Sequence, residues 1–151
     1  MDIKQIGIIG AGTMGNGIAQ AFALCGYDVT MTDISEAAVQ RGLKTVDGSL
    51  DRLVKKEKLT AEAKAAAMAR IRTATDLKAV RGSDLMIEAA TENLDLKLKI
   101  FGQLAELASE GTILATNTSS ISITRLAAAT KLSDRVIGMH FFNPVPVMQL
   151  V

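Results

Sequence analysis

Three glycines near the N-terminus have a spacing suited to binding a phosphate group. Gly10, Gly12 and Gly15 form the pattern G-x-G-x-x-G, with Thr13 and Met14 before the third glycine. Such a turn lets the backbone approach a pyrophosphate, and the N-terminus of a following helix adds a partial positive charge. The pattern alone is weak, because glycine-rich turns are common. With an apolar run before it and a helical pattern after it, it predicts a dinucleotide site.

An acid beyond the glycines supports this prediction. Asp33 follows the apolar run at residues 28–32, about twenty residues on from the glycines, where a dinucleotide-binding fold places the acid that accepts hydrogen bonds from the adenosine ribose. A carboxylate there repels a 2′-phosphate, so NAD is favoured over NADP. The structural alternative is that Asp33 only begins the next helix as an N-terminal acid.

His140 is the only histidine and follows the last apolar run, residues 136–139. Imidazole changes charge near neutral pH, so it suits the removal of a hydroxyl proton during oxidation of an alcohol. A second polar run, Asn117, Thr118, Ser119 and Ser120, follows the apolar residues 113–116 and should lie beside His140. A lone histidine is more often structural, but ligands of open α/β sheets bind at the carboxyl ends of strands.

The elements that must position these residues alternate between strand and helix. We predict strands over residues 3–9, 28–32, 70–73, 85–89, 113–116 and 136–139. Helices are predicted over 14–25, from an N-cap at Ser35 toward Lys56, from an N-cap at Thr60 to Ala69, and over 94–108 and 123–129. This order predicts the α/β class, with a doubly wound, mainly parallel sheet of the Rossmann type. We interpret residues 1–151 as one NAD-binding domain.

Composition excludes several other kinds of function. The 17 Lys and Arg nearly balance the 16 Asp and Glu, so no broad field favours nucleic acid or an anionic membrane. One histidine and one cysteine argue against a metal site built on such ligands. No signal peptide or long apolar segment is recognised, so we expect a cytoplasmic protein. Cys25 cannot form an intrachain disulfide, and its helical spacing predicts a buried, unreactive thiol.

Three motifs together carry a family resemblance. The opening GIIGAGTMGNGIAQ, the run NTSS at 117–120 and the run HFFNPVP at 140–146 resemble the 3-hydroxyacyl-CoA dehydrogenase family, particularly the bacterial 3-hydroxybutyryl-CoA dehydrogenases. The resemblance covers the whole chain. It implies NAD-dependent oxidation of an (S)-3-hydroxyacyl-CoA to the 3-ketoacyl-CoA, or the reverse reduction.

The resemblance also implies roles for residues in the second and third motifs. His140 is similar to the catalytic base of the family, and Ser119 to the hydroxyl that binds the 3-oxygen of the substrate. Asn143 resembles an asparagine that lines the same site.

Further positions match the family's ligand contacts. Glu92 and Lys97 match residues near the nicotinamide half of NAD, and Asn117 is assigned to the same cofactor site. Ser49 and Lys56 match positions that reach the CoA moiety of the substrate. A basic cluster that includes Lys56 suits CoA phosphates, although a merely solvated helix end explains it equally well.

The chain also departs from the family pattern. The family continues beyond Val151 with a glutamate that orients the histidine, and then with a helical domain that supplies a wall of the acyl-CoA site and most of a homodimer interface. We therefore expect the isolated chain to be weakly active or inactive. Two alternatives stay open. One is a 3-hydroxyacid dehydrogenase that uses a catalytic lysine, against which HFFNP argues, and the other is a noncatalytic dinucleotide-binding or crystallin-like protein.

Overall fold

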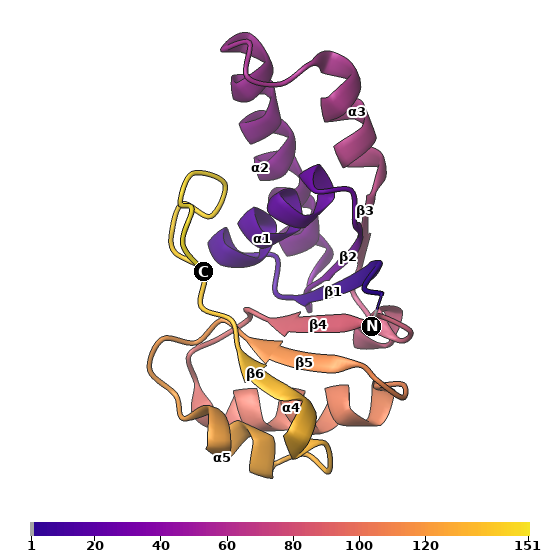
Figure 1. The fold of residues 1–151 in the computed structure, drawn as a ribbon, viewed down its shortest axis with the longest axis vertical. Helices are drawn as coiled ribbons and strands as arrows, with labels where there is room; N and C mark the ends of the chain where they lie inside the picture. Colours follow the sequence, from indigo (N-terminus) through magenta and orange to yellow (C-terminus); the bar gives the residue numbers. More distant parts are fainter. Residues whose placement is uncertain (1) are drawn as a thin grey trace.

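A six-stranded parallel sheet forms the centre of the computed structural model, which describes residues 2–151 (Figure 1). Across the sheet the strands are β3 (Ile71–Ala74), β2 (Asp28–Thr32), β1 (Gln5–Ile9), β4 (Leu85–Glu88), β5 (Ile113–Thr116) and β6 (Val136–Gly138). All five neighbouring pairs are parallel. The strand order changes direction between β1 and β4, which is where doubly wound sheets bind ligands. The predicted fold class is confirmed.

Helices cover both faces of this sheet. One layer holds α1 (Thr13–Leu24), α2 (Glu36–Lys55) and α3 (Ala61–Ala69), and the other holds α4 (Leu94–Leu107) and α5 (Ile123–Ala128) (Figure 1). Ser35 and Thr60 cap α2 and α3, since their hydroxyls accept hydrogen bonds from the N–H groups of Ala38 and Ala63. Two short 3-10 helices, η1 (Leu77–Val80) and η2 (Ser133–Arg135), were not predicted from the sequence.

The alternation of side chains along each strand builds two hydrophobic cores. Ile6 and Ile8 of β1 pack in the core under α1 and α2, whereas Ile9 packs in the core under α4. In β4, Met86 belongs to the second core and its neighbour Ile87 to the first. Both faces of the central strands are therefore buried, which explains their nearly continuous apolar runs.

Several details differ from the sequence predictions. The first strand begins at Gln5 rather than at residue 3, and the strands predicted over 85–89 and 136–139 each end one residue earlier, at Glu88 and Gly138. The third strand lies one residue later than predicted, at Ile71–Ala74. Cys25 is exposed rather than buried, so that prediction was wrong. The physical reason is that α1 ends at Leu24 and buries the face that holds Ile18, Ala19 and Ala23, while Cys25 is the C-cap residue beyond it.

Charged side chains secure two edges of the fold. The Lys64 ammonium of α3 forms ion pairs with two carboxylates of α2, those of Asp47 at 2.7 Å and Asp51 at 2.6 Å. The two carboxylates raise the pKa of Lys64, and the ammonium lowers the pKa of Asp51. The Asp84 carboxylate accepts hydrogen bonds from the backbone N–H groups of Gln5 and Lys4, each at 2.8 Å, which lowers the pKa of Asp84. The α2–α3 pair and the start of β1 are thereby held in place.

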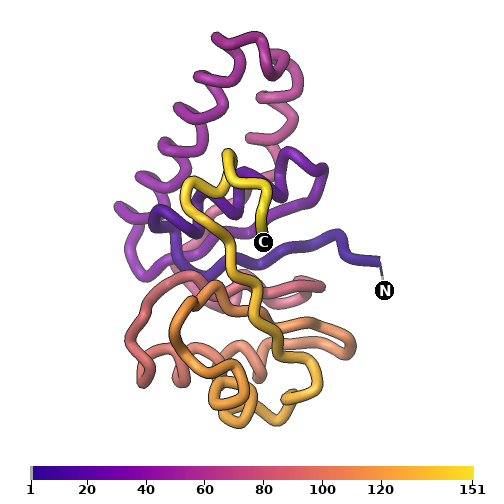
Figure 2. The backbone as a smooth tube through the Cα atoms, turned by 60° about the vertical axis from the view of Figure 1, so that its left-hand side comes forward, coloured from indigo at the N-terminus to yellow at the C-terminus, as the bar shows by residue number. Residues whose placement is uncertain are grey.

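The last residues of the chain return across α1 after β6 (Figures 1 and 2). They pack closely, because a Cβ at Gly17 of α1 would lie 3.0 Å from the Cβ of Val145. This path carries residues 143–147 from the edge of the sheet to the groove between α1 and α2. Beyond Val145, apolar side chains such as Val147 and Leu150 are exposed.

Candidate active site

The glycine turn joins the end of β1 to the start of α1. Gly10 has a φ of 105°, a conformation that L side chains rarely adopt, and a Cβ there would also lie 2.6 Å from the carbonyl oxygen of Ala89. A Cβ at Gly15 would collide with the carbonyl oxygen of Gly10. Around Gly12, in contrast, no atom lies within 4 Å of a built Cβ. Gly10 and Gly15 are thus needed for the turn itself, whereas Gly12 leaves open space in front of the N-terminus of α1, where a pyrophosphate fits.

Asp33 ties this turn to the end of β2. Its Oδ2 accepts a hydrogen bond from the N–H of Ala11 at 2.9 Å, and its Oδ1 accepts one from the N–H of Ile34 at 2.8 Å. The N–H of Gly10 also donates to the carbonyl of Thr32 at 2.7 Å. A carboxylate can accept about four hydrogen bonds, so Asp33 can still accept hydrogen bonds from the hydroxyl groups of a ligand.

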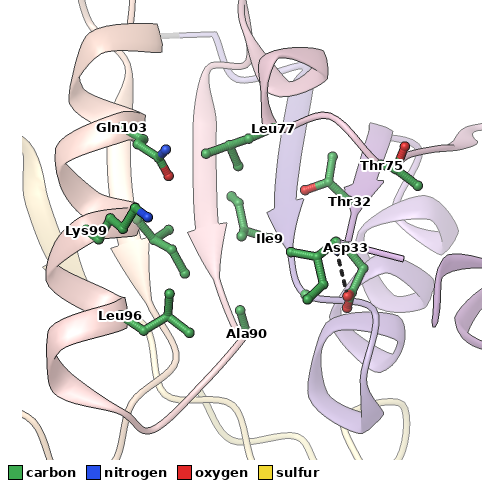
Figure 3. Close-up of a pocket in the computed structure, with 12 residues that line it drawn as sticks. Ile9, Thr32, Asp33, Thr75, Leu77, Ala90, Leu96, Lys99 and Gln103 are labelled. Carbon is green, nitrogen blue, oxygen red and sulfur yellow. Dashed lines mark hydrogen bonds between the residues drawn. The ribbon is translucent and has the colours of Figure 1, made fainter. Parts of the chain in front are cut away.

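A first cavity, of about 310 Å³, opens beside Asp33. In Figure 3, Asp33 faces Leu96 and Lys99 of α4 across this space. Its other walls are mainly apolar, with Ile9, Leu77 and Ile100 among them. An apolar slot with one carboxylate at its edge suits a planar base with an attached ribose.

A second cavity, of about 250 Å³, lies on the other side of Ala90. Its lining brings together five of the residues that the sequence assigned to the cofactor, namely Thr13, Met14, Glu92, Lys97 and Asn117. They come from the first turn of α1, the loop after β4, α4 and the end of β5. Their convergence follows from the parallel sheet, because the strands end at one edge. The two cavities flank the glycine turn, so the site fits a dinucleotide.

Under the second cavity lies a buried charge pair that sequence reasoning missed. The Lys97 ammonium donates to Oε2 of Glu88 and, at 3.3 Å, to Oγ1 of Thr116. Glu88 also accepts from the Thr116 hydroxyl at 3.0 Å and from the N–H of Ala90 at 2.9 Å. Lys97 and Glu88 are 1% and 0% exposed, so their charges require this pairing. A signal existed in the sequence, since Lys97 shares helical spacing with the core residues Phe101 and Leu104 of α4.

His140 follows β6 and lies beside the end of β5. The N–H of Met139 donates to the carbonyl of Thr116 at 2.9 Å, and the N–H of Phe141 donates to Oδ1 of Asn117 at 2.9 Å. The imidazole is partly buried and lies 4.6 Å from the ring of Phe142, centre to centre. The predicted proximity of His140 to the NTSS run is therefore observed for the backbone, and Ser119 is exposed two residues beyond Asn117.

No carboxylate within residues 2–151 hydrogen bonds to His140. Glu88 binds Lys97, and Glu92 binds the hydroxyls of Thr118 and Ser120. Both acids near the carboxyl end of β4 are thus hydrogen bonded to other partners, and neither orients the imidazole.

A third cavity, of about 350 Å³, lies between α1, α2 and residues 143–147. It is lined by Asn143 and by both residues assigned to CoA, Ser49 and Lys56, together with Arg52. The helical separation of Ser49, Arg52 and Lys56 places them on one face of α2. The cavity also contacts Thr13, so it meets the second cavity at the first turn of α1.

Residues 2–151 contain neither a candidate metal-binding cluster nor a candidate membrane-spanning helix. Within this range no group of three or more His, Cys, Asp or Glu side chains could hold a metal ion. Likewise, no helix in the described part of the chain is long and apolar enough to span a membrane.

Comparison with known proteins agrees with this geometry. A 3-hydroxybutyryl-CoA dehydrogenase of Bradyrhizobium diazoefficiens is 50% identical over 149 residues, which are 99% of this chain and 51% of that protein. One from Clostridioides difficile is 46% identical over 97% of this chain and 52% of its own length. The crystal structure of the (S)-3-hydroxybutyryl-CoA dehydrogenase from Ralstonia eutropha has a TM-score of 0.95 and 61% identity, and the match covers 97% of this chain and 52% of that one.

The chain therefore spans about half the length of these relatives. Residues 5–151 match the family model described as the NAD-binding domain of 3-hydroxyacyl-CoA dehydrogenase, which gives NAD as the cofactor. On this match, which includes the glycine turn, Asp33 and the NTSS and HFFNP runs, the chain belongs to the 3-hydroxyacyl-CoA dehydrogenase family.

Proposed function

We propose that this chain is the NAD-binding part of an enzyme that oxidises an (S)-3-hydroxyacyl-CoA, of the 3-hydroxybutyryl-CoA kind, to the 3-ketoacyl-CoA, or catalyses the reverse reduction. The observation that carries the proposal is the hydrogen bond from the N–H of Phe141 to Oδ1 of Asn117, at 2.9 Å. It holds His140 next to the NTSS loop, and Asn117 itself lines the second cavity. A proton acceptor, a hydroxyl and the cofactor site thus share one edge of the sheet.

In this proposal the cofactor lies across the glycine turn. The pyrophosphate binds at the N-terminus of α1, against the backbone of the turn formed by Gly10, Gly12 and Gly15. The Asp33 carboxylate accepts hydrogen bonds from the adenosine ribose hydroxyls beside the first cavity. The nicotinamide half occupies the second cavity, lined by Thr13, Met14, Glu92, Lys97 and Asn117. NAD, when bound, accepts the hydride from the substrate carbon.

The residues at the sheet edge act on the substrate hydroxyl. We assign His140 as the group that accepts the hydroxyl proton during oxidation and returns it during reduction. Ser119, exposed on the NTSS loop, donates a hydrogen bond to the 3-oxygen. Asn143 lines the third cavity, where it contacts the acyl part of the substrate.

The third cavity is assigned to the CoA arm. Ser49 and Lys56 line its α2 wall, and the Lys56 ammonium supplies positive charge for a phosphate. Because the relatives are about twice as long as this chain, we propose that full activity, and a homodimer, require a part corresponding to the relatives' other half. The isolated chain should be weakly active or inactive.

The experiment compares this chain with an extended protein. In the extended protein, residues 1–151 are followed by the part of the Bradyrhizobium relative that the chain does not span. Oxidation of NADH in the presence of acetoacetyl-CoA is followed by absorbance. The extended protein should be active, and its His140→Gln variant should lose about 10²- to 10⁴-fold in kcat.

NAD affinity, measured by calorimetry, is the control for this variant. It should be unchanged, because His140 is assigned to proton transfer and not to the cofactor. Unchanged kcat in the variant would refute the role of His140. An extended protein that binds NAD but has no activity would instead favour the noncatalytic dinucleotide-binding alternative.

A further inference from the structure

The carboxylate of Glu92 holds both neighbours of Ser119. The Thr118 hydroxyl donates to Oε2 of Glu92 at 2.8 Å, and the Ser120 hydroxyl donates to the same oxygen at 3.2 Å. Glu92 belongs to the loop after β4, whereas Thr118 and Ser120 belong to the loop after β5. The loop that presents Ser119 is therefore bound on either side of that residue to a different strand's loop.

Thr118 determines the shape of this loop. Its hydroxyl oxygen accepts hydrogen bonds from the N–H groups of Ser120 at 3.3 Å and Ile121 at 3.2 Å. Thr118 is 6% exposed, and its own N–H donates to Oγ1 of Thr116. The Thr118 hydroxyl accepts hydrogen bonds from the loop and donates one to Glu92, so a displacement of the Glu92 carboxylate is expected to displace the turn around Ser119.

Glu92 also lines the second cavity. Both hydroxyl bonds end on Oε2, which leaves Oε1 for a donor such as a ribose hydroxyl, since each carboxylate oxygen can accept about two hydrogen bonds. We propose that Glu92 is a positioning residue that couples the two ligand sites: when cofactor fills the second cavity, the Glu92 carboxylate is fixed, and through Thr118 and Ser120 it fixes the backbone that carries Ser119. This inference rests on the proposed assignment of NAD to that cavity.

Coupling of this kind is reciprocal. Cofactor should order the Ser119 loop before the acyl-CoA arrives, and a ligand on Ser119 should tighten cofactor binding. The loop is therefore expected to respond to NAD alone, in the absence of substrate.

The test measures backbone amide chemical shifts of the 151-residue chain by NMR during titration with NAD. In the wild type, the amides of residues 10–15 should shift because they surround the pyrophosphate, and those of residues 118–121 should shift with the same concentration dependence. In Glu92→Ala and in Thr118→Val, the shifts at 10–15 should remain at saturating NAD. The shifts at 118–121 should be lost in both variants.

Matched variants control for nonspecific effects. Glu106→Ala on α4 and Thr124→Val on α5 make the same chemical changes at exposed positions, and the response of residues 118–121 to NAD should persist in both. Thermal unfolding checks that each variant is folded. If Thr118→Val does not fold, Ser120→Ala takes its place; it removes only the longer of the two hydrogen bonds to Glu92 and should reduce the response of residues 118–121 to NAD.

The outcomes separate this inference from the proposed function. Shifts at 118–121 that are equal in the wild type, Glu92→Ala and Thr118→Val would mean that NAD acts on the loop directly, and would overturn the coupling through Glu92. Shifts confined to residues 10–15 of the wild type would overturn it as well. No shift at either place would refute the cofactor site itself.

Discussion

A single carboxylate, that of Asp33, connects the end of β2, the glycine turn and the first cavity. It accepts hydrogen bonds from the backbone N–H groups of Ala11 and Ile34, and it lies at the edge of the first cavity. The sequence alone left two interpretations of Asp33, as a ribose ligand or as an acid that begins a helix. The hydrogen bond to Ala11 favours the first, because it directs the carboxylate toward the turn, while Ser35 caps α2.

At this scale we predict that Asp33→Ala weakens NAD binding by roughly 10- to 150-fold, since hydrogen bonds to a charged group contribute about 1.5–3 kcal/mol. The preference for NAD over NADP should also narrow, because the repulsion of a 2′-phosphate is removed. Calorimetric titration of both cofactors measures these effects. Asp28→Ala, at the opposite end of the same strand, should leave NAD affinity unchanged. Undiminished NAD affinity in Asp33→Ala would contradict the assignment.

Two strands and a helix meet at the buried pair of Glu88 and Lys97. Glu88 ends β4, Thr116 ends β5 and Lys97 lies in the first turn of α4, and the hydrogen bonds among them join the three elements under the second cavity. Burial of two charges costs desolvation energy that a hydrophobic pair would avoid. We interpret the pair as a support for the cofactor site rather than as a source of extra stability.

We expect Lys97→Met to lower the free energy of unfolding by about 3–5 kcal/mol, because it leaves the Glu88 carboxylate buried without its partner. The double variant Glu88→Met, Lys97→Met should lose less than the sum of the two single variants. Urea unfolding provides the measurement. The control, Lys99→Met, changes an exposed lysine of the same helix and should stay within about 0.5 kcal/mol of the wild type. A similarly small effect of Lys97→Met would contradict the claim that the buried Glu88 carboxylate requires this partner.

Across the whole molecule, the doubly wound topology places the first two cavities at the carboxyl edge of the sheet, and the third meets the second at the first turn of α1. Gly10 lines the first cavity, and Thr13 lines the second and the third. Ligands that bind here contact elements from both halves of the sheet, and they can bind only when these elements are assembled. Binding should therefore stabilise the fold as a whole.

NAD at about 100 times its dissociation constant should add about 2.7 kcal/mol to the free energy of unfolding. For a chain of this size, this corresponds to a rise in Tm of roughly 5–11 °C. Differential scanning calorimetry with NAD, and with NADP at the same concentration, is the measurement. NADP should raise the Tm less, because Asp33 repels its 2′-phosphate. Equal effects of the two cofactors would contradict the discrimination assigned to Asp33.

Much of the fold and several site residues could be predicted because they depend on local patterns. The glycine turn, the N-caps at Ser35 and Thr60 and the apolar runs of the strands are each set by residues close together in the chain. Predictions failed where neighbours distant in sequence decide the outcome. The pair of Glu88 and Lys97 was missed because its partners come from different elements. The burial of Cys25, in contrast, was mispredicted for a local reason, because α1 ends one residue before it.

The sequence by itself determined the parallel α/β fold, the turn at Gly10 to Gly15 and the acid that follows β2. Periodicity and backbone conformation are local properties, so they can be read along the chain. Only the tertiary structure decided that Glu92 binds the loop of Ser119, that Asn117 holds the backbone next to His140, and that Lys97 is neutralised by Glu88. These contacts join the ends of different strands, and their geometry follows from the register of the sheet.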